Sequence, residues 1–111
     1  MNSDLPTSIV IFGASGDLTQ RKLVPSLFNL FRKGRMPKQF RIVGHSKTPF
    51  SDEKFRSHLA DGVKQFASYK YTQDEWNNFA PHLFYQAGSY TDQVDFKKLA
   101  DYLDKWEKPD N

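Results

Sequence analysis

Residues 9–18 read Ile9-Val10-Ile11-Phe12-Gly13-Ala14-Ser15-Gly16-Asp17-Leu18, and they determine the architecture. The four leading residues are β-branched or aromatic, which predicts a strand buried on both faces, as in parallel sheets. Gly13 and Gly16 then allow a tight turn. Apolar residues at helical spacing follow, at Leu23, Leu27, Leu30 and Phe31. A strand, a glycine turn and a helix in this order suit a pyrophosphate, because backbone N–H groups and the positive end of the helix dipole face the ligand.

The rest of the chain continues to alternate strands and helices. Further strands are predicted from Phe40 to Gly44 and from Leu83 to about Ala87. The order β-α-β-α(α)-β-α predicts an α/β fold, a Rossmann-like parallel sheet with flanking helices. Residues 1–7 are expected to form a tail and residues 8–111 a partial nucleotide-binding domain. A complete doubly wound domain usually has more strands beside the first one. We therefore expect only its first β-α-β-α-β-α portion, in a chain that is a fragment or needs a partner.

Capping and helix-breaking residues set the expected helix ends. Pro25 should kink or restart the first helix, and Gly34 should end it. Ser51 is a good cap for the second helix, and Thr72 to Glu75 fits a capping box. The apolar faces are predicted at Phe55, Leu59, Val63 and Phe66 and, in a last helix capped by Thr91 or Asp92, at Phe96, Leu99, Leu103 and Trp106.

Composition excludes several classes of protein. The 111 residues are 38% hydrophobic and 15% aromatic, enough for a core, which argues against wholesale disorder. No run of 18 apolar residues exists, which argues against a membrane helix. The absence of Cys rules out a disulfide scaffold, a Cys-ligated zinc site and a thiol nucleophile. The polar N-terminus predicts no signal peptide, and we expect a cytoplasmic protein.

Charge is distributed unevenly along the chain. Residues 1–50 carry eight Lys or Arg against two acids, whereas residues 51–111 carry eight against eleven. This pattern fits either a solvated surface or a small anionic ligand held by the first half. Nucleic acid is not expected, because no basic stripe with interleaved aromatics occurs.

The segment after the second strand bears on the choice of ligand. NAD-binding domains usually place an acid there to bind the ribose 2′-hydroxyl. Here the strand is followed by His45-Ser46-Lys47-Thr48, with no acid. A cation with hydroxyls beside it suits a 2′-phosphate, which favours NADP over NAD. An ordinary strand-to-helix turn at Gly13 and a solvated lysine at position 47 remain the alternatives.

No catalytic constellation is found. His45 is expected in the loop after the second strand, His58 in a helix and His82 before the third strand, each as a surface or packing residue. No paired carboxylates, Ser/His/Asp arrangement or metal-ligand spacing occurs. We therefore expect no catalytic and no metal-binding residue in this chain. The turn also lacks the Gly-Lys-Ser/Thr of a P-loop, and Ser15 replaces the middle glycine of G-x-G-x-x-G.

The segment Gly13-Ala14-Ser15-Gly16-Asp17-Leu18-Thr19-Gln20-Arg21-Lys22-Leu23 resembles the coenzyme motif of glucose-6-phosphate dehydrogenases. The helix segment Pro25 to Phe31, and Ile42-Val43-Gly44 with Lys47, are similar to the segments that follow in that family. The resemblance implies a cytoplasmic enzyme of the oxidative pentose phosphate pathway, homo-oligomeric when complete. It would oxidise D-glucose 6-phosphate to 6-phosphogluconolactone and transfer hydride to NADP.

By position, the resemblance implies a set of coenzyme-binding residues: Gly13, Ala14, Ser15, Gly16, Asp17, Leu18, Thr19, Lys22, Lys47, Ser89 and Tyr90. Asp17 would order the turn rather than take part in chemistry. Arg is common in the family where Lys47 stands; Lys keeps the charge but loses the bidentate fork. The family's His-Tyr-Leu-Gly-Lys-Glu motif and catalytic His are not among these residues, so we expect this chain alone to be inactive. A stand-alone NADP-binding or sensing module, and an interaction domain that lost its ligand, are the alternatives.

Overall fold

The computed structural model describes residues 6–89 and 92–107, with side chains as far as residue 105. Three strands form one parallel sheet in the order β1-β2-β3: Thr7–Phe12, Phe40–Ser46 and Leu83–Ala87. The α-helices are α1 (Val24–Arg32), α2 (Asp52–Phe66), α3 (Gln73–Phe79) and α4 (Gln93–Glu107). A π-helical turn, Thr19–Leu23, precedes α1, and a 3-10 turn, Ala80–His82, precedes β3. The element order and the open Rossmann-like parallel sheet are as predicted. β1 begins at Thr7, so it includes the last residue of the predicted tail.

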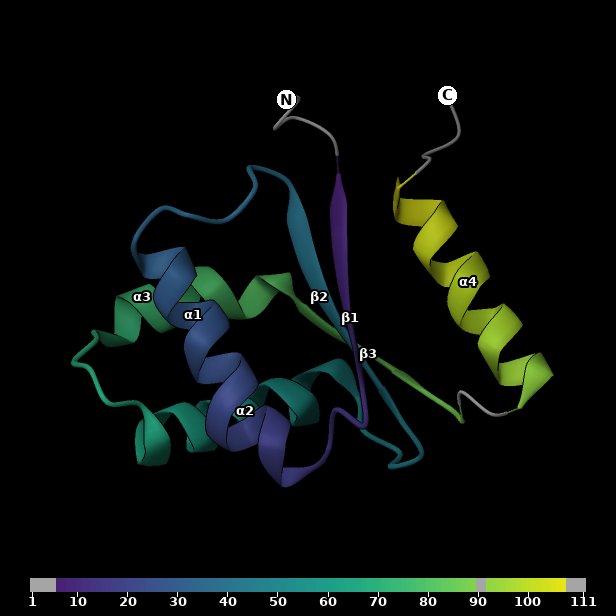
Figure 1. Ribbon diagram of the computed structural model, residues 1–111, viewed down its shortest axis with the longest axis horizontal. Helices are drawn as coiled ribbons and strands as arrows, with labels where there is room; N and C mark the ends of the chain where they lie inside the picture. Colours follow the sequence, from purple (N-terminus) through teal and green to yellow (C-terminus); the bar gives the residue numbers. More distant parts are fainter. Residues whose placement is uncertain (1–5, 90–91, 108–111) are drawn as a thin grey trace.

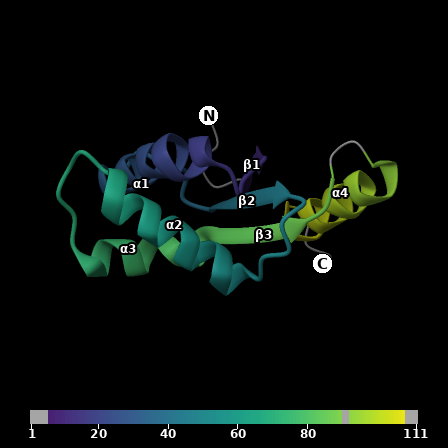
Figure 2. The same ribbon diagram turned by 90° about the horizontal axis from the view of Figure 1, so that it is seen from below.

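The helices cover the two faces of the sheet unequally. Helices α1, α2 and α3 lie together on one side, and α4 lies on the other, as both ribbon views show (Figures 1 and 2). The core fills the space between the sheet and the three helices, with Phe28, Phe55 and Phe79 fully buried there. The described residues thus form an α/β/α arrangement, in which α4 alone covers the second face of the sheet.

β2 is the strand buried on both faces, and β1 is not. Every residue of β2 from Phe40 to His45 is buried, as expected for the central strand of a parallel sheet. In β1 only Ile11 is buried, and Phe12 is 47% exposed. The prediction that residues 9–12 form a strand covered on both faces is therefore wrong for the described residues. The reason is position: β1 is an edge of this sheet, and burial depends on what stands beyond it.

The first helix restarts beside Pro25, as predicted, and presents part of the predicted apolar face. In the π-helical turn before it, the Val24 N–H bonds Thr19 O, one residue further back than in an α-helix. Val24, Pro25 and Phe28 are buried, and the predicted Leu27 and Phe31 pack, partly buried, against the core. Leu23 and Leu30 are 39% exposed, contrary to the prediction.

Most predicted helix ends are confirmed. Ser51 Oγ accepts the Lys54 N–H, and Thr72 with Glu75 forms a full capping box. Gly34 ends α1 with a φ of +69°, and the next residue's N–H bonds Leu30 O at 2.9 Å. Asp92 Oδ1 accepts the first two N–H groups of α4 beyond Gln93. Thr91 and the side chain of Trp106 lie outside the described residues.

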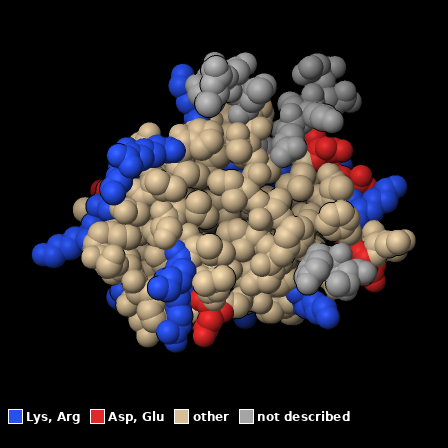
Figure 3. All heavy atoms as spheres, in the orientation of Figure 1, with Lys and Arg blue, Asp and Glu red and all other residues tan. Residues whose placement is uncertain are grey.

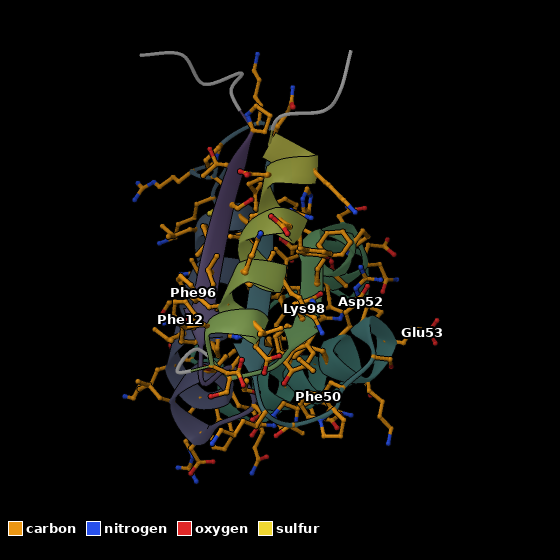
Figure 4. All side chains as sticks on the ribbon, turned by 90° about the vertical axis from the view of Figure 1, so that its right-hand side faces the viewer. Phe12, Phe50, Asp52, Glu53, Phe96 and Lys98 are labelled. Carbon is orange, nitrogen blue, oxygen red and sulfur yellow. The ribbon has the colours of Figure 1, made fainter. Side chains whose placement is uncertain are left out.

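The last helix differs from prediction in one respect. Leu99 is buried, as expected, but Phe96 is 49% exposed. Its ring stacks on Phe12 of β1, with centroids 6.4 Å apart, and the two lie side by side in Figure 4. Phe96 therefore covers the outer rim of β1 and does not join the core.

The two edges of the sheet are finished differently. On β3, Asp52 Oδ1 accepts the Tyr85 N–H at 2.8 Å and Arg56 Nε donates to Leu83 O at 2.8 Å. On β1, the backbone groups of residues 9–11 meet no side-chain partner in the part of the chain that the structure describes. An apolar groove of about 430 Å³ runs along this edge. Figure 3, in the orientation of Figure 1, shows an uncharged middle to this face of the molecule. The sheet is thus closed at β3 and open at β1.

Gly44 is the position in β2 that cannot carry a side chain. A Cβ there would lie 2.5 Å from Phe55 Cζ and 2.7 Å from Ala14 Cβ, both in buried residues. We expect Gly44→Ala to lower the free energy of unfolding by about 1–3 kcal/mol, the usual cost of overpacking. Urea denaturation of the chain measures this. In Gly44→Ala/Phe55→Leu the loss should be smaller than the sum of the two single losses, because the smaller side chain vacates the space. Full stability of Gly44→Ala would contradict the close contact.

Candidate functional site

The glycine turn is fixed over the end of β2. Gly13 adopts a φ of +68°, in the left-handed region that favours glycine. Its N–H donates to His45 O at 2.8 Å, and Gly16 N–H donates back to Gly13 O at 3.0 Å. Ala14 is fully buried against Gly44. A second, longer bond runs from the Ala14 N–H to the same carbonyl, at 3.5 Å. The turn is therefore held against the end of β2 by backbone hydrogen bonds to His45 O and by the packing of Ala14.

β2 continues two residues further than predicted, to Ser46. His45 is therefore in the strand and not in the loop, and it is fully buried. Its Nδ1 lies 2.7 Å from Gln86 O on β3, and its ring contacts the edge of Phe12. The imidazole thus bonds to the neighbouring strand. A hydrogen bond of this kind offsets part of the cost of burying a polar side chain in the strand. His58 and His82 are also packing residues, against Phe50 and Phe40 respectively.

Four hydroxyl groups meet where the turn approaches the end of β2. Ser15 Oγ accepts from Ser46 Oγ at 3.1 Å and from Thr48 Oγ1 at 3.0 Å. The Tyr85 hydroxyl, at the third strand, lies 2.5 Å from Ser46 Oγ. These four residues, which we call the hydroxyl cluster, connect the ends of β1, β2 and β3.

A hollow of about 270 Å³ opens beside this cluster. It is lined by Gly13, Ser15, Ser46, Lys47, Thr48, Gly88 and Ser89. These residues follow or end the three strands, so the hollow lies outside the carboxyl ends of the sheet, where open α/β folds bind their ligands. Lys47, an exposed side chain, provides the one charge among the residues named, and it is positive. Small polar side chains and a single cation suit an anionic ligand with hydroxyl groups.

The structure gathers only part of the predicted site around this hollow. Gly13, Ser15, Lys47 and Ser89 line it. Ala14 and Thr19 are buried beneath the turn, whereas Gly16, Asp17 and Leu18 are exposed on it, with Asp17 Oδ2 3.7 Å from Arg21 Nε. Tyr90 lies outside the described residues.

Lys22 lies in a different hollow, between α1 and the end of α2. This space of about 290 Å³ is lined also by Arg21, Ser26 and Tyr69. Burial raises the pKa of Tyr69 to about 12, although the Arg32 guanidinium opposes that shift. The structure does not bring Lys22 together with Lys47.

Sequence reasoning missed the connections of the site more than its members. The hydroxyls of Ser46 and Thr48 were noted beside Lys47, but their bonds to Ser15 were not predicted. Tyr85 was assigned only to a strand, and Gly88 only to its end. The partners in the hydroxyl cluster are 31 to 39 residues apart in sequence, so no local pattern marks them.

Neither a metal cluster nor a membrane-spanning helix occurs among the described residues. In the ranges 6–89 and 92–107, no group of three His, Asp or Glu residues could hold a metal ion. No helix in these ranges is long and apolar enough to span a membrane.

The parallel sheet, the glycine turn into a helix and the polar hollow at the strand ends define a dinucleotide-binding domain of the Rossmann type. Comparison with known families gives the particular one. The sequence model described as "Glucose-6-phosphate dehydrogenase, NAD binding domain" matches residues 10–111, and the chain belongs to this family.

Individual relatives agree with this assignment. The chain is 37% identical to glucose-6-phosphate 1-dehydrogenase of Chlamydia pneumoniae, over 93% of this chain and 20% of that protein. It is 34% identical to the Leuconostoc mesenteroides enzyme of the same name, over 95% of this chain and 21% of that protein. A solved glucose-6-phosphate dehydrogenase in complex with glucose-6-phosphate superposes with a TM-score of 0.79 and 32% identity, over 95% of this chain and 22% of that one. The chain thus spans about a fifth of the length of these relatives.

Gly13 and Gly34 offer a matched test of the turn. Both have a φ near +70°, and at both positions a Cβ would meet nothing within 4 Å. Gly13→Ala and Gly34→Ala should therefore each cost about 1–2 kcal/mol of stability through backbone strain alone. Urea denaturation measures the cost. Gly13→Asn should lose less than Gly13→Ala, because Asn adopts this conformation more easily. Equal losses for Asn and Ala would mean that something other than backbone strain acts at the turn.

Proposed function

We propose that this chain is the coenzyme-binding part of a glucose-6-phosphate dehydrogenase, and that the coenzyme is NADP. The observation that carries the proposal is the hollow in which Lys47 stands beside Ser15, Ser46 and Thr48 at the carboxyl ends of the strands. The pyrophosphate is assigned to the turn from Gly13 to Thr19, where backbone N–H groups open the helical segment. The ribose carrying the 2′-phosphate is assigned to Lys47.

The preference for NADP rests on charge and on hydrogen-bond donors. A carboxylate at the end of β2 would accept the two ribose hydroxyls of NAD and repel a 2′-phosphate. Position 47 instead offers an ammonium group, and the flanking residues offer hydroxyls that can donate to phosphate oxygens. Ser89 lies across the hollow and is assigned to the adenosine side of the coenzyme; its N–H is held by Asp95 Oδ2 at 3.0 Å.

The complete reaction is proposed for a longer protein. Relatives five times the length of this chain are named glucose-6-phosphate 1-dehydrogenase. In such a protein this part would hold NADP while D-glucose 6-phosphate is oxidised to 6-phosphogluconolactone, in the oxidative pentose phosphate pathway of the cytoplasm, in a homo-oligomer. The 111 residues alone are assigned coenzyme binding without turnover.

Substitution of Lys47 tests the coenzyme assignment. A charge-assisted hydrogen bond contributes roughly 1.5–3 kcal/mol, so Lys47→Ala should weaken NADP binding about 10- to 100-fold. NAD binding should stay within about twofold. Lys47→Arg should keep or tighten NADP binding, because the guanidinium fork matches phosphate. The measurement is the pair of dissociation constants from NMR titrations of the chain at fixed salt.

Lys64→Ala is the matched control, because it removes an exposed lysine from the far end of α2. It should leave both dissociation constants within about twofold, a change that long-range charge alone would explain. Equal weakening of NADP and NAD by Lys47→Ala would overturn the 2′-phosphate assignment. If the unaltered chain binds neither coenzyme at millimolar concentration, the proposed function of this chain is overturned.

A second prediction concerns turnover. The chain with glucose 6-phosphate and NADP should produce no NADPH absorbance above a buffer control, because no described side chain forms an acid–base pair near the hollow. The assay is followed at high chain concentration, with a full-length glucose-6-phosphate dehydrogenase as positive control. Turnover that scales with the concentration of the purified chain would contradict this assignment.

A further inference from the structure

The side chain of Tyr85 reaches from β3 to the loop that carries Lys47. Its ring is buried, and its hydroxyl lies 2.6 Å from Thr48 O and 3.0 Å from Ser46 O. These carbonyls belong to the residues on either side of Lys47. Because carbonyl oxygens only accept, the single phenol proton is shared between them, with Thr48 O the nearer acceptor. The hydroxyl thus holds the backbone on both flanks of the lysine.

Tyr85 is itself held rigidly. Its ring packs against Phe55, with centroids 4.9 Å apart, and against Phe50 at 5.3 Å. Its backbone N–H donates to Asp52 Oδ1 at the start of α2. The ring of Tyr85 is therefore fixed in the core, and its hydroxyl is bonded to the loop.

The same hydroxyl also connects the loop to the glycine turn. It contacts Ser46 Oγ, and Ser46 Oγ in turn donates to Ser15 Oγ. Thr48 Oγ1 supplies a second bond to Ser15. Since Ser15 Oγ accepts both of these bonds, its own proton is left for another acceptor. The orientation of Ser15 and the position of Lys47 are thus set by one connected group of atoms.

We propose that Tyr85 is a positioning residue that makes the site selective for a 2′-phosphorylated adenine dinucleotide. It touches no ligand and acts by fixing the backbone at Lys47, so that the ammonium group is presented to the 2′-phosphate. This inference rests on the proposed function for the identity of the ligand. Binding costs conformational entropy when it must order the loop that carries the lysine. This cost is smaller when the loop is already fixed in the ligand-free chain.

Tyr85→Phe removes only the hydroxyl and keeps the ring in the core. Losing one such hydrogen bond should weaken NADP binding roughly three- to tenfold and leave NAD within about twofold. Amide hydrogen exchange at residues 46–48 should become faster in the ligand-free chain, because the loop loses its anchor. In a Lys47→Ala background, Tyr85→Phe should have no further effect on NADP binding, since the group it positions is absent.

Tyr69→Phe is the matched control. The Tyr69 hydroxyl also donates to one backbone carbonyl, that of Pro25, but in the other hollow. It should leave the NADP to NAD ratio and the exchange of residues 46–48 unchanged. Urea denaturation of both variants shows whether stability alone differs between them.

The outcomes separate this inference from the proposed function. Faster exchange at residues 46–48 with a selective loss of NADP affinity supports Tyr85 as a positioning residue. Unchanged exchange, or equal weakening of NADP and NAD, overturns it. If the unaltered chain does not distinguish NADP from NAD, the proposed function fails, and the role of Tyr85 in selectivity fails with it; the exchange result then still decides whether Tyr85 holds the loop.

Discussion

The contact between the glycine turn and β2 is the constraint on which the rest of the structure depends. Gly13 donates to His45 O, and one residue later Ala14 lies where a side chain on Gly44 would stand. Phe55 of α2 packs at the same point. The bonds to His45 O and the missing side chain at Gly44 therefore fix how closely the turn and α2 pack against β2.

The two edges of the sheet differ in whether other parts of the chain bond their outer backbone groups. α2 begins with Asp52, a carboxylate favoured at a helix N-terminus, and the same carboxylate accepts the N–H of Tyr85 on β3. The outer backbone groups of β3 are thus bonded by α2, the helix that follows β2 directly. Among the described residues, β1 has no comparable helix on its outer side, and its rim is covered only in part, by Phe96. The open edge, in a chain that spans about a fifth of its relatives, is a consequence of strand order and not of a weak β1 sequence.

Local signals in the sequence predicted the elements, whereas burial required the fold. Ser51, Thr72 and Gly34 could be assigned because a cap acts within four residues of itself. The strands expected beside the first one, and absent from the predicted portion, already place β1 at an edge, but the apolar run alone predicted burial on both faces. The exposure of Phe96 could not be predicted, because it depends on where α4 packs against β1. The apolar face of α1 was predicted only in part: Leu27 and Phe31 pack against the core, but Leu23, in the π-helical turn before Pro25, is 39% exposed. Hydrophobic spacing contains no sign of such a turn. The end of β2 was placed too early because His45 is polar, although its bond to Gln86 O makes its burial possible.

The same distinction separates the two halves of the candidate site. A glycine turn can be found in sequence because its backbone requirement is local, but it supplies N–H groups that any pyrophosphate would accept. In the coenzyme site proposed above, discrimination at the ribose comes from the end of β2, where the Tyr85 hydroxyl, 38 positions further along the chain, bonds the backbone on both sides of Lys47. The hydroxyl cluster joins the glycine turn to the Lys47 loop through Ser15. Under this proposal, selectivity depends on contacts between three strand ends, and residue types at the motif alone do not determine it.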